Sequence, residues 1–394
     1  MTTKNNITIG YKDSAVGIIP EEWEVRRLGE ICLTFKSGTT ITSQKIRKSD
    51  LYPVYGGNGL RGYTNFYTHD GDYILIGRQG ALCGNINFIK GKAYISEHAI
   101  AVQPNKYNSI EFLRHKLDFW NLNRFSESSA QPGLSVEKLV RYKLAVPPLE
   151  EQKKIAEILS TWDEAIEKQS KLIEKLELRK RGIMQRLLTG RTRLPGFTTP
   201  WQKVSYSEIL KEIKRNIIWN DNEEYDLISV KRRSGGLFHR DKLLGKDIKT
   251  KNLRPANIGD FLISKMQIVH GASGLVTKEF DGMKISGSYI ALVAKDKNKT
   301  DINFINWYSK TPHFYHQTYV SSSGVHIEKM TFDLNSFMSM NMKIPSFIEQ
   351  KAIVNLLNTI DKEINIQIKK LETLRTQKRG LMQQLLTGKT RVKI

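Results

Sequence analysis

Apolar residues recur on a seven-residue grid in two long segments of the chain. In the first segment the grid runs from Ile155 to Leu187, and in the second it runs from Ile353 to Leu385. Heptad spacing of apolar residues is typical of helices that pair along a seam. The pattern therefore predicts two long helices that form a coiled coil. A helix of roughly 40 residues, at 1.5 Å per residue, is a rod of about 60 Å.

The two helical segments are copies of one another. The stretch Glu151–Arg193 returns as Glu349–Arg391 without a gap, at an offset of 198 residues, and 23 of its 43 positions are identical. Internal repetition of this kind indicates an architecture built from repeated units. Because the offset is half the chain length, the protein is predicted to consist of two similar halves. Both copies end in Leu-Leu-Thr-Gly, which makes Gly190 and Gly388 typical helix-stopping residues.

Polar residues interrupt the apolar seam at the same places in both copies, at Gln169 with Gln367 and at Lys180 with Lys378. If the helices are antiparallel, the two glutamines could meet and hydrogen-bond, which would fix the register at some cost in stability. Alternatively, they are two solvated side chains at the edge of the seam. The sequence leaves both interpretations open.

Outside the helices the pattern changes to short apolar runs punctuated by Gly, Asn and Ser. Residues 72–77, 99–102 and 289–293 are predicted strands, and residues 109–121 and 301–310 are predicted short helices. Each half therefore contains a variable body of mixed α+β structure ahead of its helix. The predicted segments are body 1 over residues 1–149, helix 1 over 150–190, body 2 over 191–347 and helix 2 over 348–394.

The charge balance narrows the class of partner. The chain has 394 residues, with 62 Lys and Arg against 40 Asp and Glu, for a formal net charge of +22. Such a field favours a polyanionic partner, either nucleic acid or an anionic membrane. No stretch approaches the ~20 apolar residues that a membrane span needs. The N-terminus lacks a signal-peptide pattern, and two distant cysteines, Cys32 and Cys83, exclude a disulfide framework. We expect a cytoplasmic protein that contacts nucleic acid and not a membrane.

Loops of the two bodies carry side chains that can contact DNA. Asn reads adenine and Arg reads guanine by paired hydrogen bonds, and glycine allows the backbone to approach a partner closely. In body 1 the candidates are Lys45, Arg47, Tyr55, Asn58, Arg61, Tyr63, Arg78, Gln79, Ser129 and Gln131. In body 2 they are Lys231, Arg232, Arg233, Lys265, Gln267, Ser322 and His326. A loop of this composition can equally be an ordinary turn, so these assignments rest on the set as a whole.

Catalytic and metal motifs are not complete in this sequence. Gly388-Lys389-Thr390 resembles the end of a phosphate-binding loop, but Gln383 stands where that loop needs glycine. Pro147-Pro148 lacks the flanking polar and aromatic residues of a methyltransferase motif, and no His pair has zinc-ligand spacing. We expect no catalytic centre, no metal site and no cofactor bound by this chain.

Two variable domains, each followed by a Pro-x-x-x-Glu-Gln helix that ends in Leu-Leu-Thr-Gly, resemble the specificity subunit of type I restriction–modification enzymes. The motif reads Pro147-Pro-Leu-Glu-Glu151-Gln152 in the first half and Pro345-Ser-Phe-Ile-Glu349-Gln350 in the second. The segments Tyr52–Asn58 and Gly77–Gly80 are similar to common segments of the target recognition domains in that family. The resemblance spans essentially the whole chain. Body 2 lacks the Tyr-Gly-Gly-Asn loop and has Lys265-Met-Gln267 in place of Gly-Arg-Gln.

The resemblance implies an α+β fold with two target recognition domains and an antiparallel pair of spacer helices related by a pseudo-two-fold axis. Each domain would read one half of a bipartite DNA site, and the helices would set the gap between the halves. Two adenine-methylating subunits would dock on the chain, and two restriction subunits would join them. S-adenosylmethionine, ATP and Mg²⁺ would be held by those partners. The expected docking residues are Glu151, Gln152, Arg181, Glu349, Gln350 and Arg379. The alternative function is a non-catalytic basic coiled-coil scaffold that binds DNA non-specifically.

Overall fold

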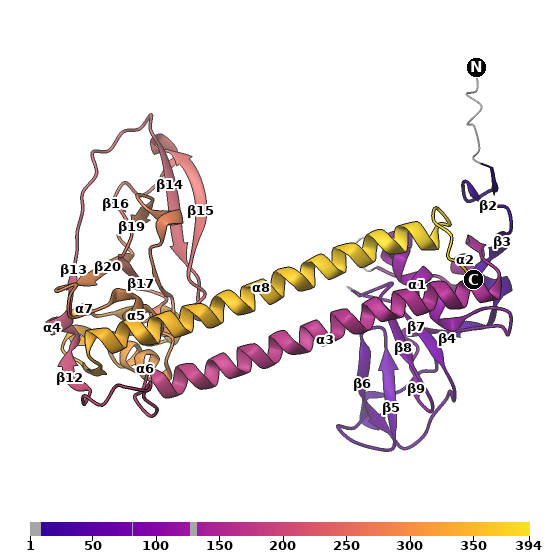
Figure 1. The fold of residues 1–394 in the computed structure, drawn as a ribbon, viewed down its shortest axis with the longest axis horizontal. Coiled ribbons are helices and arrows are strands. Elements are labelled where there is room, and N and C mark those ends of the chain that lie inside the picture. The colour runs from indigo at the N-terminus through magenta and orange to yellow at the C-terminus, as the bar shows by residue number, and fades with distance from the viewer. Residues whose placement is uncertain (1–8, 81, 127–131) are drawn as a thin grey trace. The chain divides into compact units, whose positions relative to one another are not determined.

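The structure is a computed structural model that describes residues 9–80, 82–126 and 132–394. It divides into two compact units, of which unit 1 comprises Met1–Lys171 with Ile368–Ile394 and unit 2 comprises Leu172–Gln367. Both long helices are shared, because the division cuts α3 (Leu149–Leu187) and α8 (Phe347–Leu386) near their middles (Figure 1). The predicted segments follow the order of the chain, whereas each compact unit consists of one body and half of each long helix.

Unit 1 contains a four-stranded antiparallel sheet in the order β4-β10-β7-β8 and a three-stranded sheet in the order β6-β5-β9. Ile74 and Ile76 of β7 share a buried cluster with Leu113 and Leu117 of α1, whereas Leu75 belongs to a second cluster. Because successive side chains of a strand point to opposite faces, this sheet is covered on both sides. The elements are β1 (Tyr11–Lys12), β2 (Ile19–Pro20), β3 (Glu24–Arg27), β4 (Cys32–Ser37), β5 (Tyr52–Gly56), β6 (Gly59–Thr64), β7 (Tyr73–Gly77), β8 (Ile86–Ile89), β9 (Tyr94–Ile95), β10 (Ala99–Pro104), α1 (Ile110–Phe119), α2 (Val136–Leu139) and β11 (Lys143–Val146).

Unit 2 repeats this arrangement. Its antiparallel sheet has the order β13-β20-β17-β18, and its second sheet has the order β15-β14-β19-β16. In both units the second sheet contains an antiparallel hairpin joined to a parallel strand, β6-β5-β9 in one and β15-β14-β19 in the other. The elements are β12 (Gln202–Ser205), α4 (Tyr206–Ile209), β13 (Leu210–Glu212), β14 (Glu224–Val230), β15 (Leu237–Leu244), β16 (Leu253–Pro255), β17 (Phe261–Ser264), β18 (Ser273–Leu275), β19 (Lys284–Ser286), β20 (Tyr289–Ala294), α5 (Ile302–Tyr308), α6 (Pro312–Val320), β21 (Ser322–Ser323), β22 (Thr331–Phe332), α7 (Leu334–Met338) and β23 (Asn341–Ile344).

These observations confirm the α+β prediction for both bodies. The predicted strands at 72–77, 99–102 and 289–293 are β7, β10 and β20, and the predicted short helices are α1 and α5. The matching sheet orders also make the β5–β6 turn of body 1 equivalent to the β14–β15 turn of body 2. That equivalence relates the Gly-rich loop of body 1 to the basic turn of body 2, although their sequences differ.

The long helices pair antiparallel within each unit. In unit 1, α3 and α8 share a buried cluster that includes Ile155 and Leu385, and the carboxylate of Asp163 lies 2.5 Å from Nζ of Lys378. In unit 2 the same pairing recurs at the repeat offset, between Lys180 of α3 and Asp361 of α8. The lysines that interrupt the apolar seam are therefore neutralised by aspartates of the opposite helix.

The seam glutamines differ from each other. Gln169 is 6% exposed, so the interpretation of a solvated residue at the seam edge is wrong for it. Gln367 is half-buried.

Both helix stops are confirmed, because Gly190 and Gly388 adopt left-handed backbone conformations with φ of 69° and 75°.

Candidate nucleic-acid interface

In body 1 the Gly-rich turn between β5 and β6 lies against the end of β7. A Cβ atom at Gly57 would be 2.9 Å from the carbonyl oxygen of His98 and 3.3 Å from Cα of Gly77. Only glycine permits this close approach. The turn that carries exposed Asn58 is thereby held next to Arg78, so two predicted DNA-reading segments come together.

The backbone around Arg78 is fixed on both sides. Its N–H donates to the carbonyl of His98 at 2.9 Å, and its own carbonyl accepts from the N–H of Leu134 at 3.0 Å. Gln79 forms a backbone bridge with Gly133, and its side chain is exposed. The predicted contacts Ser129 and Gln131 lie outside the described residues. Fixed backbone with free side chains suits a recognition loop, because less conformational entropy is lost on binding.

The other candidates in body 1 surround this hairpin. Arg47 and Tyr63 exchange backbone hydrogen bonds of 2.8 and 2.9 Å, and the side chain of exposed Arg61 lies 3.5 Å from the hydroxyl of Ser96. Lys45 is exposed at the end of a short 3-10 helix, Ser43–Lys45, that precedes the hairpin. Tyr55 differs from these residues, because its side chain is half-buried and packs on a hydrophobic cluster of the sheet.

In body 2, segments that carry predicted DNA contacts lie close to His270 and Glu328, two residues that the sequence did not indicate. The N–H of Arg233, in the β14–β15 turn, donates to the carbonyl of His270 at 2.7 Å. The guanidinium of Arg232 lies 3.0 Å from the carboxylate of Glu328. The N–H of Phe332 donates to the carbonyl of Lys265 at 3.0 Å.

Topology accounts for this clustering. Phe332 belongs to β22, which pairs with Ser322 of β21, so the hairpin that carries exposed His326 is joined to the segment of Lys265 and half-buried Gln267. Lys231 is exposed on the β14–β15 turn. His270 and Glu328 were missed, because their proximity to the basic turn depends on contacts between distant segments.

The Glu-Gln pair of the first repeated motif is buried at the start of α3. The Glu151 carboxylate accepts hydrogen bonds from Arg391 at 2.6 and 2.9 Å and from the indole N–H of Trp23 at 2.9 Å. The Gln152 amide donates to the carbonyl of Pro147 at 2.9 Å, and its oxygen accepts from the N–H of Ser109 at 2.8 Å. The hydrogen bonds to Glu151 also hold the pKa of Arg391 above its usual range.

The second motif repeats this geometry at the offset of 198 residues. The Glu349 carboxylate accepts two hydrogen bonds of 2.6 Å from Arg193. The Gln350 amide donates to the carbonyl of Pro345 at 2.9 Å, and its oxygen accepts from the N–H of Asp301 at 2.8 Å. In each unit the motif joins the start of one long helix to its body and to the segment that follows the other helix.

This geometry corrects the expected docking role of the four motif residues. The exposed fractions of Glu151, Gln152, Glu349 and Gln350 are 0%, 1%, 0% and 1%, so their side chains have no surface with which to contact a partner subunit. Their hydrogen bonds are satisfied within the chain. They hold the helix ends in place. Arg181 and Arg379 are exposed, and their docking role stays a prediction.

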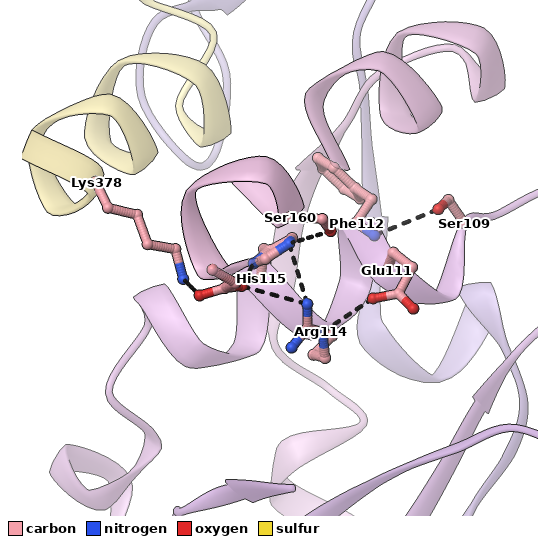
Figure 2. A network of polar contacts seen from close by, with 8 residues as sticks. Ser109, Glu111, Phe112, Arg114, His115, Ser160 and Lys378 are labelled. Carbon is pink, nitrogen blue, oxygen red and sulfur yellow. Dashed lines mark hydrogen bonds and ion pairs between the residues drawn. The ribbon is translucent and has the colours of Figure 1, made fainter. Parts of the chain in front are cut away.

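A polar network joins α1 to both long helices in unit 1 (Figure 2). Arg114 of α1 contacts Glu111 at 3.0 Å and Asp163 of α3 at 3.4 Å, and the same Asp163 carboxylate binds Lys378. His115 lies 3.3 Å from the hydroxyl of Ser160. Burial, together with the charges of Arg114 and Lys378, lowers the pKa of His115 to about 3 against the opposing effect of Asp163. The imidazole is therefore neutral near pH 7.

Residues 9–80, 82–126 and 132–394 contain no group of three His, Cys, Asp or Glu side chains placed to hold a metal ion. Over the same residues, no helix is both long and apolar enough to cross a bilayer.

Comparisons with known proteins agree with this geometry. Residues 20–178 match the family described as type I restriction modification DNA specificity domain. A specificity subunit of the Escherichia coli enzyme EcoprrI is 43% identical over 159 residues, which cover 39% of this chain and 39% of that protein. A putative MjaX specificity subunit of Methanocaldococcus jannaschii is 26% identical over 97% of each chain.

Solved structures extend the likeness of fold to nearly the whole chain. The crystal structure of the type I restriction–modification S subunit from M. genitalium has a TM-score of 0.59 at 13% identity and covers 98% of each chain. A chain from a study of type I complex assembly has a TM-score of 0.59 at 17% identity, covering 94% of this chain and 99% of that one. Repeated α+β bodies, paired helices and basic loops define a two-domain specificity-subunit fold. The family match covers residues 20–178, and the solved structures show the same fold over nearly the whole chain.

Proposed function

We propose that this chain is the DNA-reading subunit of a type I restriction–modification complex. Each body reads one half of a bipartite, asymmetric site, and the paired helices fix the gap between the halves. The observation that carries the proposal is the exact recurrence of the helix junctions at the repeat offset: Glu151–Arg391 and Asp163–Lys378 in unit 1, and Glu349–Arg193 and Asp361–Lys180 in unit 2.

The recurrence matters because the helix junctions are constant while the loops of the bodies differ. In body 1 the β5–β6 turn presents Asn58, whereas the equivalent turn of body 2 presents Arg232. Different side chains on equivalent loops read different base edges, because amides favour adenine and guanidinium groups favour guanine. Two bodies with one scaffold and different loops suit an asymmetric site.

The partners in this proposal are double-stranded DNA, two modification subunits and two restriction subunits. The modification subunits supply S-adenosylmethionine and methylate adenine, and the restriction subunits supply ATP-driven translocation and cleavage with Mg²⁺. The chain contributes recognition without catalysis and works in the cytoplasm. Support comes from the family and from the formal charge of +22, which favours contact with DNA phosphates.

The test is adenine-methylation mapping across a genome. The chain is expressed with a compatible modification subunit, and that subunit is expressed alone as the control. New methylation at two short half-sites with a constant gap is the expected result, and it appears only when both chains are present. Absence of new methylation, despite a verified complex with an active modification subunit, would contradict the proposal. The alternative of a scaffold with non-specific DNA binding predicts that absence and gains no support from the comparisons.

A further inference from the structure

Unit 2 contains a basic hollow of about 710 Å³ where α3 meets body 2. We infer that this hollow binds a backbone phosphate of DNA, a contact that positions the duplex without reading its sequence. The inference rests on the proposed function and adds to it a site where helix and body hold DNA together. The lining of the hollow includes Lys180, Arg181, Arg233, Ser234, Lys310 and Tyr315.

Three cations from different elements line the hollow. Arg181 extends from α3, Arg233 from the β14–β15 turn, and Lys310 from the loop between α5 and α6. Among the described residues none of these three forms an ion pair within 4 Å, whereas Lys180 beside them is paired with Asp361. One carboxylate, that of Glu177, also lines the hollow. The lining therefore keeps an excess of positive charge that an anion can neutralise.

Lys310 shows the effect of this excess charge. Its ammonium nitrogen lies 4.0 Å from the ring centre of Trp307, and that of Lys180 lies 5.4 Å from the same centre. Burial lowers the pKa of Lys310, and the charge of Lys180 lowers it further, against the opposing effect of Asp361. A phosphate in the hollow would favour the charged form of the ammonium group, which is the form that binds it.

The turn that carries Arg233 is strained and held in place. Arg233 and Ser234 have φ of 56° and 53°, and the left-handed region is sterically unfavourable for non-glycine residues. Strain of this kind persists where the surroundings impose it, and it concentrates at functional sites. Here the N–H groups of Arg233 and Ser234 donate to the carbonyls of His270 and Gly271 at 2.7 and 2.9 Å.

Tyr315 locks the same turn from the side of α6. Its hydroxyl lies 2.8 Å from the hydroxyl of Ser234, and a Cβ atom at Gly271 would be only 1.9 Å from it. Gly271 must therefore be glycine for the tyrosine to reach the turn. Guanidinium, ammonium and hydroxyl groups are the donors that contact phosphate in protein–DNA complexes. The hollow presents all three kinds on a fixed frame.

The site also changes the interpretation of Arg181. The resemblance assigned this residue to partner docking, but it lines the hollow with Glu177 and Met184, which lie on the same face of α3. Arg179, two residues earlier in the same helix, is exposed and lies outside the hollow. Arg179 therefore provides a matched control of equal charge.

The test uses the full chain assembled with its modification subunit. Its affinity is measured over a range of salt concentrations for a duplex with the mapped site and for a duplex of unrelated sequence. We expect R181A and R233A each to lower the slope of log affinity against log salt by roughly 0.9, and to weaken binding to both duplexes about eightfold at 0.1 M salt. R233K and R179A should keep the wild-type slope, and the ratio of the two affinities should stay constant.

Three outcomes would overturn the inference. R181A and R233A could keep the wild-type slope, or they could weaken binding to the mapped duplex alone, which would make them base-reading residues. They could also fail to assemble with the modification subunit while R179A assembles, which would make the hollow a protein-docking surface. If the wild-type complex itself binds both duplexes equally, the proposed function fails, and the slopes still report separately on the hollow.

Discussion

Replacing Arg193 with alanine should destabilise unit 2 more than replacing Arg391 destabilises unit 1. The Glu349 carboxylate is fully buried, and within the described residues both hydrogen bonds to this carboxylate come from Arg193. The Glu151 carboxylate keeps a donor after loss of Arg391, because the indole N–H of Trp23 lies 2.9 Å away. R193A therefore leaves the buried Glu349 carboxylate without its side-chain donor, whereas R391A leaves the buried Glu151 carboxylate with the indole N–H of Trp23.

The magnitude follows from the cost of leaving a buried charge unpaired, about 3–5 kcal/mol. The side chain of Arg193 is 25% exposed, so water can partly replace it, and we expect about 3 kcal/mol for R193A. R391A should cost about 2 kcal/mol, since one buried hydrogen bond to the carboxylate remains. For a unit of about 200 residues, 3 kcal/mol corresponds to a fall in Tm of roughly 6–12 °C.

Thermal and urea unfolding of the full-length variants measure this effect, with R193A/E349Q as the third variant. The amide of glutamine carries no charge, so the double variant should recover part of the stability that R193A loses. A smaller loss for R193A than for R391A, or no recovery in the double variant, would refute the reasoning.

Three further predictions concern other parts of the molecule. The pKa of His115 is about 3 in the folded chain and about 6.5 when the chain is unfolded, so the free energy of unfolding should not depend on this group above pH 6.5. As the pH drops from 6.5 towards 3, the free energy of unfolding should fall by about 1.4 kcal/mol per pH unit, and H115N should flatten this slope in urea titrations. An unchanged slope in H115N would mean that His115 titrates normally. Gly57→Ala should push the Asn58 turn away from Arg78 and weaken binding to the mapped site but not to unrelated DNA. Gly182→Ala is the control, because no atom lies within 4 Å of a Cβ atom built at Gly182. An equal loss of affinity of Gly57→Ala for both duplexes would contradict this prediction. Inserting four residues at repeat-matched positions of both long helices should change the gap in the methylated site, and altered half-sites with an unchanged gap would argue against the spacer role.

Much of the fold could be predicted because its signals are local. The heptad grid and the repeat of 23 identical positions predicted α3 and α8, and alternating apolar runs predicted β7, β10 and β20. Gly190 and Gly388 were predicted as helix stops from their position after the last apolar residue, and both have positive φ. Periodicity and caps depend on neighbours a few residues apart, which the sequence displays directly.

The docking interpretation of the Glu-Gln motifs failed for a physical reason. A glutamate at the start of a helix usually faces solvent and interacts with the helix dipole. Here Glu151 is buried, because Arg391 reaches it from 240 positions along the chain. Nothing near Glu151 in the sequence indicates that partner, although the repeat could have suggested it, since Arg193 and Arg391 are also copies of one another.

The sequence by itself determined the two helices, the repeat, the positive charge and the resemblance to a known family, since each depends on composition or on a pattern within a continuous stretch. Only the tertiary structure decided which loops form one surface: Gly57 against Gly77, and Arg233 against His270. It alone placed Arg181 and Arg233 around one hollow. Such contacts join segments far apart in the chain, and they exist only after burial of the apolar faces of sheets and helices has brought those segments together.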